Sequence, residues 1–241
     1  MAFRNKADQI LRFNPDILVI PESESEEKIN FNKHIKTPKQ KLWVGKNINK
    51  GLLVASYSDF YKIGINKLYN EDCKFILPID VSYSNADFIL LAVWTQSTGN
   101  SYDSYVVQAY RAINYYIKLL GKDSIIIGDF NSNAIWDDGD KKEATHTDLV
   151  NILSKIGIES LYHTKTNTKQ GQEQDSTLYL HRKEHKRYHV DYIFSGKSWT
   201  NKLSNIEIGG FEDWIKYSDH MPIIADFITE TPVIENIHNA Y

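Results

Sequence analysis

The chain has 241 residues and a mass of 27.9 kDa, a length that one layered α/β domain can reach. With 41% apolar, 12% aromatic and 24% charged residues it can bury a core, which excludes a disordered or fibrous protein. The net charge of −3 argues against a protein that coats nucleic acid through overall positive charge.

The compartment is indicated by what the sequence lacks. Its single cysteine, Cys73, cannot form an intrachain disulfide, which favours a reducing compartment. The first residues carry charges and no apolar signal-peptide core, and the longest apolar run, 88–94, is too short to cross a bilayer. We therefore expect a cytoplasmic protein that does not act at a membrane.

Taken in chain order, the elements alternate between helical and extended patterns. A short helix is expected over 2–13, ahead of Pro15. Short apolar runs bounded by turn residues predict strands at 16–20, 51–56, 88–94, 124–127, 189–195 and 222–227. Because these runs are apolar at successive positions, the strands should be buried on both faces.

Two longer helices are predicted from apolar residues at helical spacing. They cover 106–120 and 149–156, and Gly121 and Gly157 are placed to end them. The polar segment 163–188 is expected to be a long loop or a hairpin. The mixed order predicts a layered α/β sandwich, with two packed sheets and helices outside. Without linkers or repeats, residues 1–241 should form one domain, with 228–241 as a C-terminal tail.

Positive charge is concentrated in two segments. Six lysines and no acid lie between Lys33 and Lys50, and six Lys or Arg side chains lie between Lys165 and Arg187. Either segment could contact phosphate groups, and either could equally be a solvent-exposed loop.

Acids, amides and a histidine lie at the ends of several predicted strands. The four segments are 20–22 (IPE), 128–131 (GDFN), 189–192 (HVDY) and 218–222 (SDHMP). A side chain at the end of a buried strand is held by a rigid scaffold, which suits a metal ligand. Carboxylate and amide oxygens favour Mg²⁺ or Mn²⁺ over zinc, and a histidine beside an acid can act on a water molecule.

These motifs in this order resemble the endonuclease/exonuclease/phosphatase family, which includes pancreatic deoxyribonuclease. The resemblance rests on PDILVIPE at 15–22, GDFN, HVDYIF at 189–194 and SDHMP, and extends from about residue 14 to 227. Each motif alone recurs by chance, whereas all four in order do not. The resemblance implies a deoxyribonuclease-like sandwich that hydrolyses phosphoester bonds with Mg²⁺ or Mn²⁺.

The resemblance also assigns roles to individual residues. Glu22 corresponds to a metal ligand, and Asp219 to a second carboxylate near the metal. Asp129 would either activate the attacking water or protonate the leaving oxygen, and the sequence leaves both open. Asn131 would hold a phosphate oxygen.

The remaining predicted residues are His220, Asp191 and Trp94. His220 would be the general base or a donor to the transition state, and Asp191 would accept its other ring N–H. Such a carboxylate fixes the tautomer and raises the imidazole pKa above about 6.5. Trp94 ends the strand where relatives carry a histidine or tyrosine, and it is interpreted either as a substrate-stacking ring or as a core aromatic.

Structural explanations compete with each of these assignments. A strand-end acid often caps a turn, and a lone histidine is more often structural than catalytic, so only the ordered set favours a site. The pattern H-x-x-E-H at 181–185 is found in one class of zinc proteases, but here it is charged on all sides and is set aside.

Family members generally open with a strand carrying a Trp-Asn-x-Asn-like sequence. Residues 1–4 resemble the segment that follows it, so the family's first strand is expected to be missing. Among substrates we favour nucleic acid, because the two basic segments flank the motifs. The alternatives are a phosphatase or phospholipid phosphodiesterase with the same site, or a non-catalytic binding module that has lost part of the metal site. Protein partners are left open.

Overall fold

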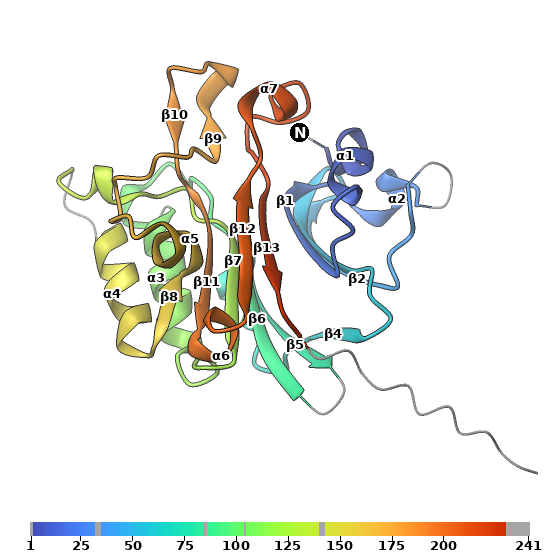
Figure 1. Ribbon diagram of the computed structural model, residues 1–241, viewed down its shortest axis with the longest axis horizontal. Coiled ribbons are helices and arrows are strands. Elements are labelled where there is room, and N and C mark those ends of the chain that lie inside the picture. The colour runs from blue at the N-terminus through green and yellow to red at the C-terminus, as the bar shows by residue number, and fades with distance from the viewer. Residues whose placement is uncertain (1, 32–34, 84–85, 104, 140–142, 230–241) are drawn as a thin grey trace, which may run out of the picture.

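The computed structural model describes residues 2–31, 35–83, 86–103, 105–139 and 143–229. Helices and strands are mixed along the chain, as the sequence predicted (Figure 1). Most of the expected tail, from 230 onward, lies outside the described residues. Among the helices in the described part, none combines the length and apolar character needed to cross a membrane.

The larger sheet has six strands. In spatial order they are β4 (Tyr61–Ile65), β5 (Ile76–Tyr83), β6 (Ala86–Trp94), β7 (Ser124–Asp129), β11 (Asp191–Gly196) and β8 (Ile158–Ser160). The β6–β7 pair is parallel and the other pairs are antiparallel. β6 and β7 therefore end, and β11 begins, at the same edge of the sheet.

Two smaller sheets pack against one face of this sheet. One has the order β1 (Ile17–Ser23), β3 (Lys50–Ser56), β2 (Gln40–Asn47), and the other pairs β12 (Leu203–Ile208) with β13 (Ile223–Phe227). Leu52 and Val54 of β3 meet Leu77, Leu90 and Ile193 of the larger sheet in one apolar cluster. This cluster is the core between the two layers, as expected for a sandwich.

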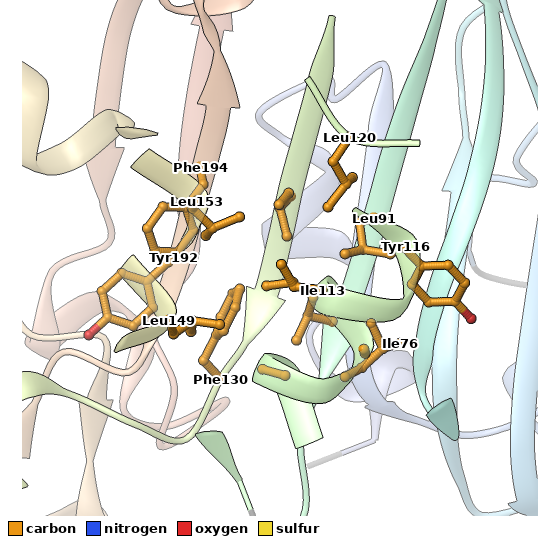
Figure 2. Packing of buried hydrophobic residues seen from close by; sticks show 14 of the residues in the cluster. Ile76, Leu91, Ile113, Tyr116, Leu120, Phe130, Leu149, Leu153, Tyr192 and Phe194 are labelled. Atoms are coloured by element: carbon orange, nitrogen blue, oxygen red, sulfur yellow. The ribbon is translucent and has the colours of Figure 1, made fainter. Parts of the chain in front are cut away.

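Helices cover the outer faces of both layers. On the larger sheet lie α3 (Val106–Tyr116) and α4 (His146–Lys155), which bury Ile113, Leu149 and Leu153 against Leu91 and Phe194 (Figure 2). On the three-stranded sheet lie the 3₁₀ turn η1 (Phe3–Asn5), α1 (Ala7–Leu11) and α2 (Glu26–Ile29). Shorter helices are α5 (Leu161–Thr166), α6 (Lys197–Thr200) and α7 (Phe211–Trp214).

The predicted elements are present with shifted ends. All six predicted strands are found, as β1, β3, β6, β7, β11 and β13. The helix predicted over 106–120 ends at Tyr116, and the one predicted over 2–13 is divided into η1 and α1. Segment 163–188 holds the end of α5 and a hairpin of β9 (Leu178–Tyr179) and β10 (Arg187–Tyr188).

Burial on both faces, expected for these strands, is wrong for β1 and β13. Ile17, Leu18 and Val19 are only partly buried, and so are Ile223 and Ile224. Each strand has a hydrogen-bonded neighbour on one side only, among the residues described. A missing lateral neighbour leaves part of an apolar strand uncovered.

Candidate active site

The candidate site forms where β7 ends and β11 begins. Asp129, the last residue of β7, is the register partner of Asp191, the first residue of β11. His220 lies in the turn ahead of β13, where it forms a bridge with Leu178 of β9. Asp129, Asp191 and His220 each offer one carboxylate oxygen or ring nitrogen as a possible ligand atom. These three atoms all lie within 4.8 Å of one another. The fold thus joins three of the predicted residues.

Gly128 allows Asp129 to reach this position. Its φ is +147°, and a Cβ added there would lie 1.9 Å from the carbonyl oxygen of Val93 on the neighbouring strand. No other residue fits this close approach, since such contacts do not occur between real atoms. The glycine of the GDFN motif is therefore required by the pairing of β6 with β7.

Asp129 is a buried carboxyl group, with an exposed fraction of 4%. Its Oδ1 accepts the backbone N–H of Asn131 at 2.9 Å, and its Oδ2 accepts the Asn131 side-chain amide at 2.6 Å. Burial raises its pKa to about 7, with a further contribution from the charge of Asp191 and a partial offset from His220. Near neutral pH this carboxyl group can both hold and release a proton.

Asp191 and His220 form a hydrogen-bonded pair. The Nδ1 atom of His220 lies 2.9 Å from Oδ2 of Asp191, as predicted, and the backbone N–H of Asp191 donates to Oγ1 of Thr177 at 3.0 Å. Burial alone would lower the imidazole pKa, but Asp191 and Asp129 outweigh it and raise the pKa of His220 to about 10. With Nδ1 turned to Asp191, the Nε2 atom is the one available to a bound molecule.

Asn131 is held differently from the prediction. Its φ is +45°, and its side-chain amide donates to Oδ2 of Asp129 and, at 3.2 Å, to the carbonyl oxygen of Thr95. Both amide hydrogens therefore have acceptors within the protein. In this arrangement Asn131 fixes the orientation of Asp129, and its contact with a phosphate oxygen stays a proposal.

Glu22 and Asp219 lie at the margin of the three-residue cluster. Glu22 has a φ of +59° and pairs with Lys50, with 2.6 Å between Oε1 and Nζ. Its negative charge nevertheless contributes to the raised pKa of Asp129, so both acids lie in one region. The charge of Asp219 acts on His220 in the same way. Their roles as metal ligands remain proposals.

Trp94 lies in the core. Its exposed fraction is 3%, its ring centroid is 4.9 Å from that of Phe75, and the Nζ atom of Lys50 lies 5.6 Å above it. Little of the ring is left for a substrate. Of the two interpretations of this residue, the structure favours the core aromatic.

Lys6 is a residue of this region that the sequence did not indicate. It lines a cavity of about 120 Å³ together with Gly128, Asp191 and His220. Burial lowers its pKa, against the opposing effect of carboxylates that include Asp191, Glu22 and Asp219. A lysine in a short helical segment carries no signal for such a position, because only the fold brings α1 to the sheet edge.

Glu24 is a second residue of this region that the sequence did not indicate. It is buried, with an exposed fraction of 1%. Its carboxylate accepts the backbone N–H groups of Phe3 at 2.6 Å and Arg4 at 3.1 Å, and a guanidinium N–H of Arg4 at 3.0 Å. This acid holds η1, and hence Lys6, beside the strand that carries Glu22.

An aromatic cavity of about 370 Å³ borders Asn131, the residue that orients Asp129. Asn131 lines it together with Tyr105, Trp136 and Tyr188. The Trp136 and Tyr188 rings lie 5.1 Å apart, and 38% of Trp136 is exposed. The cavity therefore combines accessible aromatic faces with a residue of the site.

The donor set suits a hard divalent cation. Carboxylates dominate the region. The pKa of Asp129 is raised first by burial and then by the negative charges of Asp191 and Glu22, and a cation would offset those charges. Glu22 and Asp219 provide further oxygen atoms at the margin. The H-x-x-E-H segment, by contrast, begins in a 3₁₀ turn with His181 at a positive φ, so it lacks the helix that a zinc protease needs.

Sequence comparison gives no match, either to a protein-family model or to a curated protein. Solved structures do match. An AP endonuclease from Archaeoglobus fulgidus has 18% identity and a TM-score of 0.64, covering 95% of this chain and 96% of that chain. A 3'-5' exonuclease from Neisseria meningitidis has 14% identity and a TM-score of 0.62, covering 94% and 96%.

A third structure, an endonuclease/exonuclease/phosphatase family protein from Leptotrichia buccalis, has 18% identity and a TM-score of 0.58, covering 94% of this chain and 92% of that chain. Identities this low establish the fold and not the activity. The resemblance to the endonuclease/exonuclease/phosphatase family is thus confirmed as a shared fold over nearly the whole chain.

Proposed function

We propose that this protein is a metal-dependent phosphodiesterase whose preferred substrate is nucleic acid. The observation that carries the proposal is the hydrogen-bonded pair of His220 and Asp191 beside the buried Asp129 at one sheet edge. A histidine oriented by a carboxylate, next to a carboxyl group with a pKa of about 7, is an arrangement suited to proton transfer.

Each residue has a distinct task in hydrolysis. Asp191 holds the His220 ring so that Nε2 faces a phosphoryl oxygen, and the raised pKa keeps the imidazolium protonated. The imidazolium then donates a hydrogen bond to negative charge that develops in the transition state. Asp129, oriented by Asn131, accepts the proton of the attacking water or returns one to the leaving oxygen.

A Mg²⁺ or Mn²⁺ ion held by Glu22 and Asp219 would neutralise charge on the phosphoryl oxygens. Glu22 is free to serve this purpose only if it leaves Lys50, whose ammonium group forms an exposed ion pair of modest strength with it. Lys6 provides a further positive charge, and it could contact the phosphate from the cavity of about 120 Å³ that it lines with Asp191 and His220.

Nucleic acid is favoured because basic and aromatic side chains lie beside the site. The β9–β10 hairpin is anchored to it by the Leu178–His220 bridge and by the hydrogen bond from Tyr179 N–H to the Asp219 carbonyl. Exposed basic side chains of this hairpin include Arg182, Lys183 and Arg187. They can contact backbone phosphates, while Trp136 and Tyr188 offer rings for stacking. A related 3' phosphatase from Neisseria is described as bound to a product DNA hairpin.

The activity can be tested on a panel of substrates. Single-stranded, double-stranded and abasic oligonucleotides, a phospholipid and small phosphoesters would be incubated with Mg²⁺, Mn²⁺ or chelator. We expect oligonucleotide cleavage that needs a divalent ion and falls about 100-fold or more in Asp129→Asn. Asp59→Asn, which changes an exposed acid away from the site, is the matched control.

The other outcomes separate the competing functions. Cleavage of phosphoesters or phospholipid alone would contradict the nucleic-acid preference and leave a phosphatase or lipid phosphodiesterase. An absence of cleavage under all conditions would leave a non-catalytic binding module.

The aromatic cavity has its own test. Trp136→Ala should raise KM for a single-stranded oligonucleotide about 10-fold, since base stacking is worth roughly 1–3 kcal/mol, with kcat changed much less. Trp136→Phe should retain most of the affinity. Equal KM values for Trp136→Ala and the natural protein would rule out stacking in this cavity.

A further inference from the structure

Thr177 is a buried residue at the base of the β9–β10 hairpin, the hairpin that leads into β11 (Figure 1). Its backbone N–H donates to the carbonyl oxygen of Tyr188 at 2.9 Å, and this hydrogen bond extends the pairing of the two hairpin strands by one residue. Thr177 is therefore held in place directly beside the segment that begins with Asp191.

The side chain of Thr177 binds the start of β11. Its Oγ1 atom accepts the backbone N–H of Val190 at 2.9 Å and the backbone N–H of Asp191 at 3.0 Å. The carbonyl group of Val190 in turn accepts the N–H of Phe130, which follows Asp129, at 3.0 Å. One hydroxyl group thus fixes the backbone from which the Asp191 side chain projects.

The backbone of Thr177 binds the segment that carries His220. Its carbonyl oxygen accepts the N–H of Met221 at 2.7 Å, and Met221 follows His220 directly. The next residue in the chain, Leu178, forms a bridge with His220 itself. Hydrogen bonds of one residue therefore reach both of the segments that supply the His220–Asp191 pair.

The His220–Asp191 contact depends on such a link. Its two residues are 29 positions apart in the chain, and 2.9 Å separates Nδ1 from Oδ2. In the described part of the chain, β11 and β13 belong to different sheets, so no ladder of backbone hydrogen bonds sets the distance between them. A shift of about 1 Å at a reacting group can lower a rate about 100-fold, so this distance has to be held closely.

A buried hydroxyl group is often only structural. One that satisfies two buried N–H groups stabilises a fold wherever it lies, because unpaired N–H groups are costly in the interior. What distinguishes Thr177 is where its hydrogen bonds end, at Asp191 on one side and beside His220 on the other.

We propose that Thr177 is the positioning residue of the candidate site, and that its hydroxyl and carbonyl groups hold Asp191 and His220 at hydrogen-bonding distance. Thr177 acts through these two residues and does not itself contact the substrate. Its effect on catalysis rests on the proposed function. Its effect on the His220–Asp191 contact is measured without a substrate.

Two substitutions separate the hydroxyl group from the shape of the side chain. Thr177→Val keeps the branched shape and removes the acceptor, whereas Thr177→Ser keeps the hydroxyl group and removes a methyl group. Thr200→Val is the matched control. Thr200 lies beyond the opposite end of β11, where its Oγ1 atom is 2.9 Å from Oγ of Ser195.

The first measurement follows the Nδ1 proton of His220 by NMR, without metal or substrate. A proton held in a hydrogen bond exchanges slowly with water, and its exchange becomes faster when the contact opens more often. We expect exchange at least about 10-fold faster in Thr177→Val than in the natural protein, and a change of less than about 2-fold in Thr177→Ser and Thr200→Val.

The second measurement is the divalent-ion-dependent cleavage of an oligonucleotide. Thr177→Val should lower kcat about 10-fold or more and change KM less than about 3-fold, because it misplaces reacting groups and leaves the substrate contacts intact. Thr177→Ser should recover most of kcat. If the natural protein cleaves no substrate, the proposed function fails, and the exchange of the His220 ring proton still decides the role of Thr177.

Two results would overturn the proposal. One is ring-proton exchange in Thr177→Val equal to that of the natural protein. The other is an equal effect of Thr177→Val and Thr177→Ser, since the hydroxyl group would then not be the cause. Should Thr177→Val fail to fold, Thr177→Cys replaces it, because a thiol is a weaker acceptor of nearly the same size, and unchanged ring-proton exchange there would overturn the proposal as well.

Discussion

At the residue scale, the chemistry of the site depends on one hydrogen bond. His220 has a pKa raised to about 10 because the carboxylates of Asp191 and Asp129 outweigh the effect of burial. A raised histidine pKa means that the ring stays protonated across the neutral range. It would act as a donor in this range, and as a base only after metal or substrate binding changes its surroundings.

Removing the charge of Asp191 should therefore lower the pKa of His220. We expect Asp191→Asn to reduce it by at least about one unit, the effect of losing an opposite charge at contact distance. The measurement is an NMR titration of the His220 ring, with the exposed Asp123→Asn as control. An unchanged titration in Asp191→Asn would show that this pair does not set the proton affinity of the ring.

Sequence reasoning predicted which residues would meet, and the catalytic roles assigned to them stay predictions. The pairing of His220 with Asp191 was predicted and is confirmed by a 2.9 Å contact, because a motif order can indicate which strand ends converge. Lys6 and Glu24 were missed, since their positions depend on a 3₁₀ turn packing against a bulged strand. For Trp94 the sequence left both a stacking ring and a core aromatic open, because the packing of the ring against Phe75 depends on the depth of the sheet.

At the element scale, α4 is fixed at its start by a capping box. Oγ1 of Thr145 accepts the backbone N–H of Asp148 at 3.1 Å, and Oδ2 of Asp148 accepts the backbone N–H of Thr145 at 2.9 Å. Both contacts satisfy N–H groups that a helix end leaves without intrahelical partners.

Loss of this cap should weaken the fold by a modest amount. Thr145→Ala is expected to lower the free energy of unfolding by about 1 kcal/mol, while Thr145→Ser should lose only a few tenths. Denaturant unfolding measures both values. Equal stability of the alanine variant and the natural protein would mean that the capping box contributes nothing.

Apolar patterns predicted six strands and missed others, among them the inner strand β5. β7 and β6 were recognised because uninterrupted apolar residues mark a strand covered on both sides. β12 alternates polar and apolar residues over a short span, and β4 is interrupted by Gly64, so neither was predicted. The apolar runs of β1 and β13 indicated full burial, but both strands are partly exposed because each lacks a hydrogen-bonded neighbour on one side among the described residues.

At the scale of the whole molecule, buried histidines couple stability to pH. His146 is 1% exposed, with Nδ1 2.9 Å from Oγ of Ser132 and Nε2 3.2 Å from Oε1 of Gln170. Burial lowers its pKa to about 4. In the unfolded chain the pKa of this histidine returns to about 6.5. Between that pH and about 4, the unfolded state therefore binds a proton that the folded state does not bind.

Stability supplied by His146 is therefore complete above pH 6.5 and is lost as the pH falls toward 4. Between pH 7 and pH 5 this loss amounts to about 2 kcal/mol. Asp129, with a pKa raised to about 7, acts in the opposite direction, so the comparison must be made between variants.

Between pH 7 and pH 5, the free energy of unfolding of His146→Gln should fall by about 2 kcal/mol less than that of the natural protein, because glutamine does not titrate. His185→Gln, at an exposed position, is the control. Urea unfolding at pH 7 and pH 5 gives the values. The same pH dependence in His146→Gln and the natural protein would contradict a neutral buried histidine at this site.

The whole account depends on Asp191 and His220 working as one catalytic unit. The most direct measurement is the divalent-ion-dependent rate of cleavage of one oligonucleotide by Asp191→Asn, His220→Gln and the double variant. We predict that each single change lowers kcat/KM by about 100-fold or more and that the double variant is little worse than His220→Gln alone. Single variants with the rate of the natural protein would contradict the proposed site.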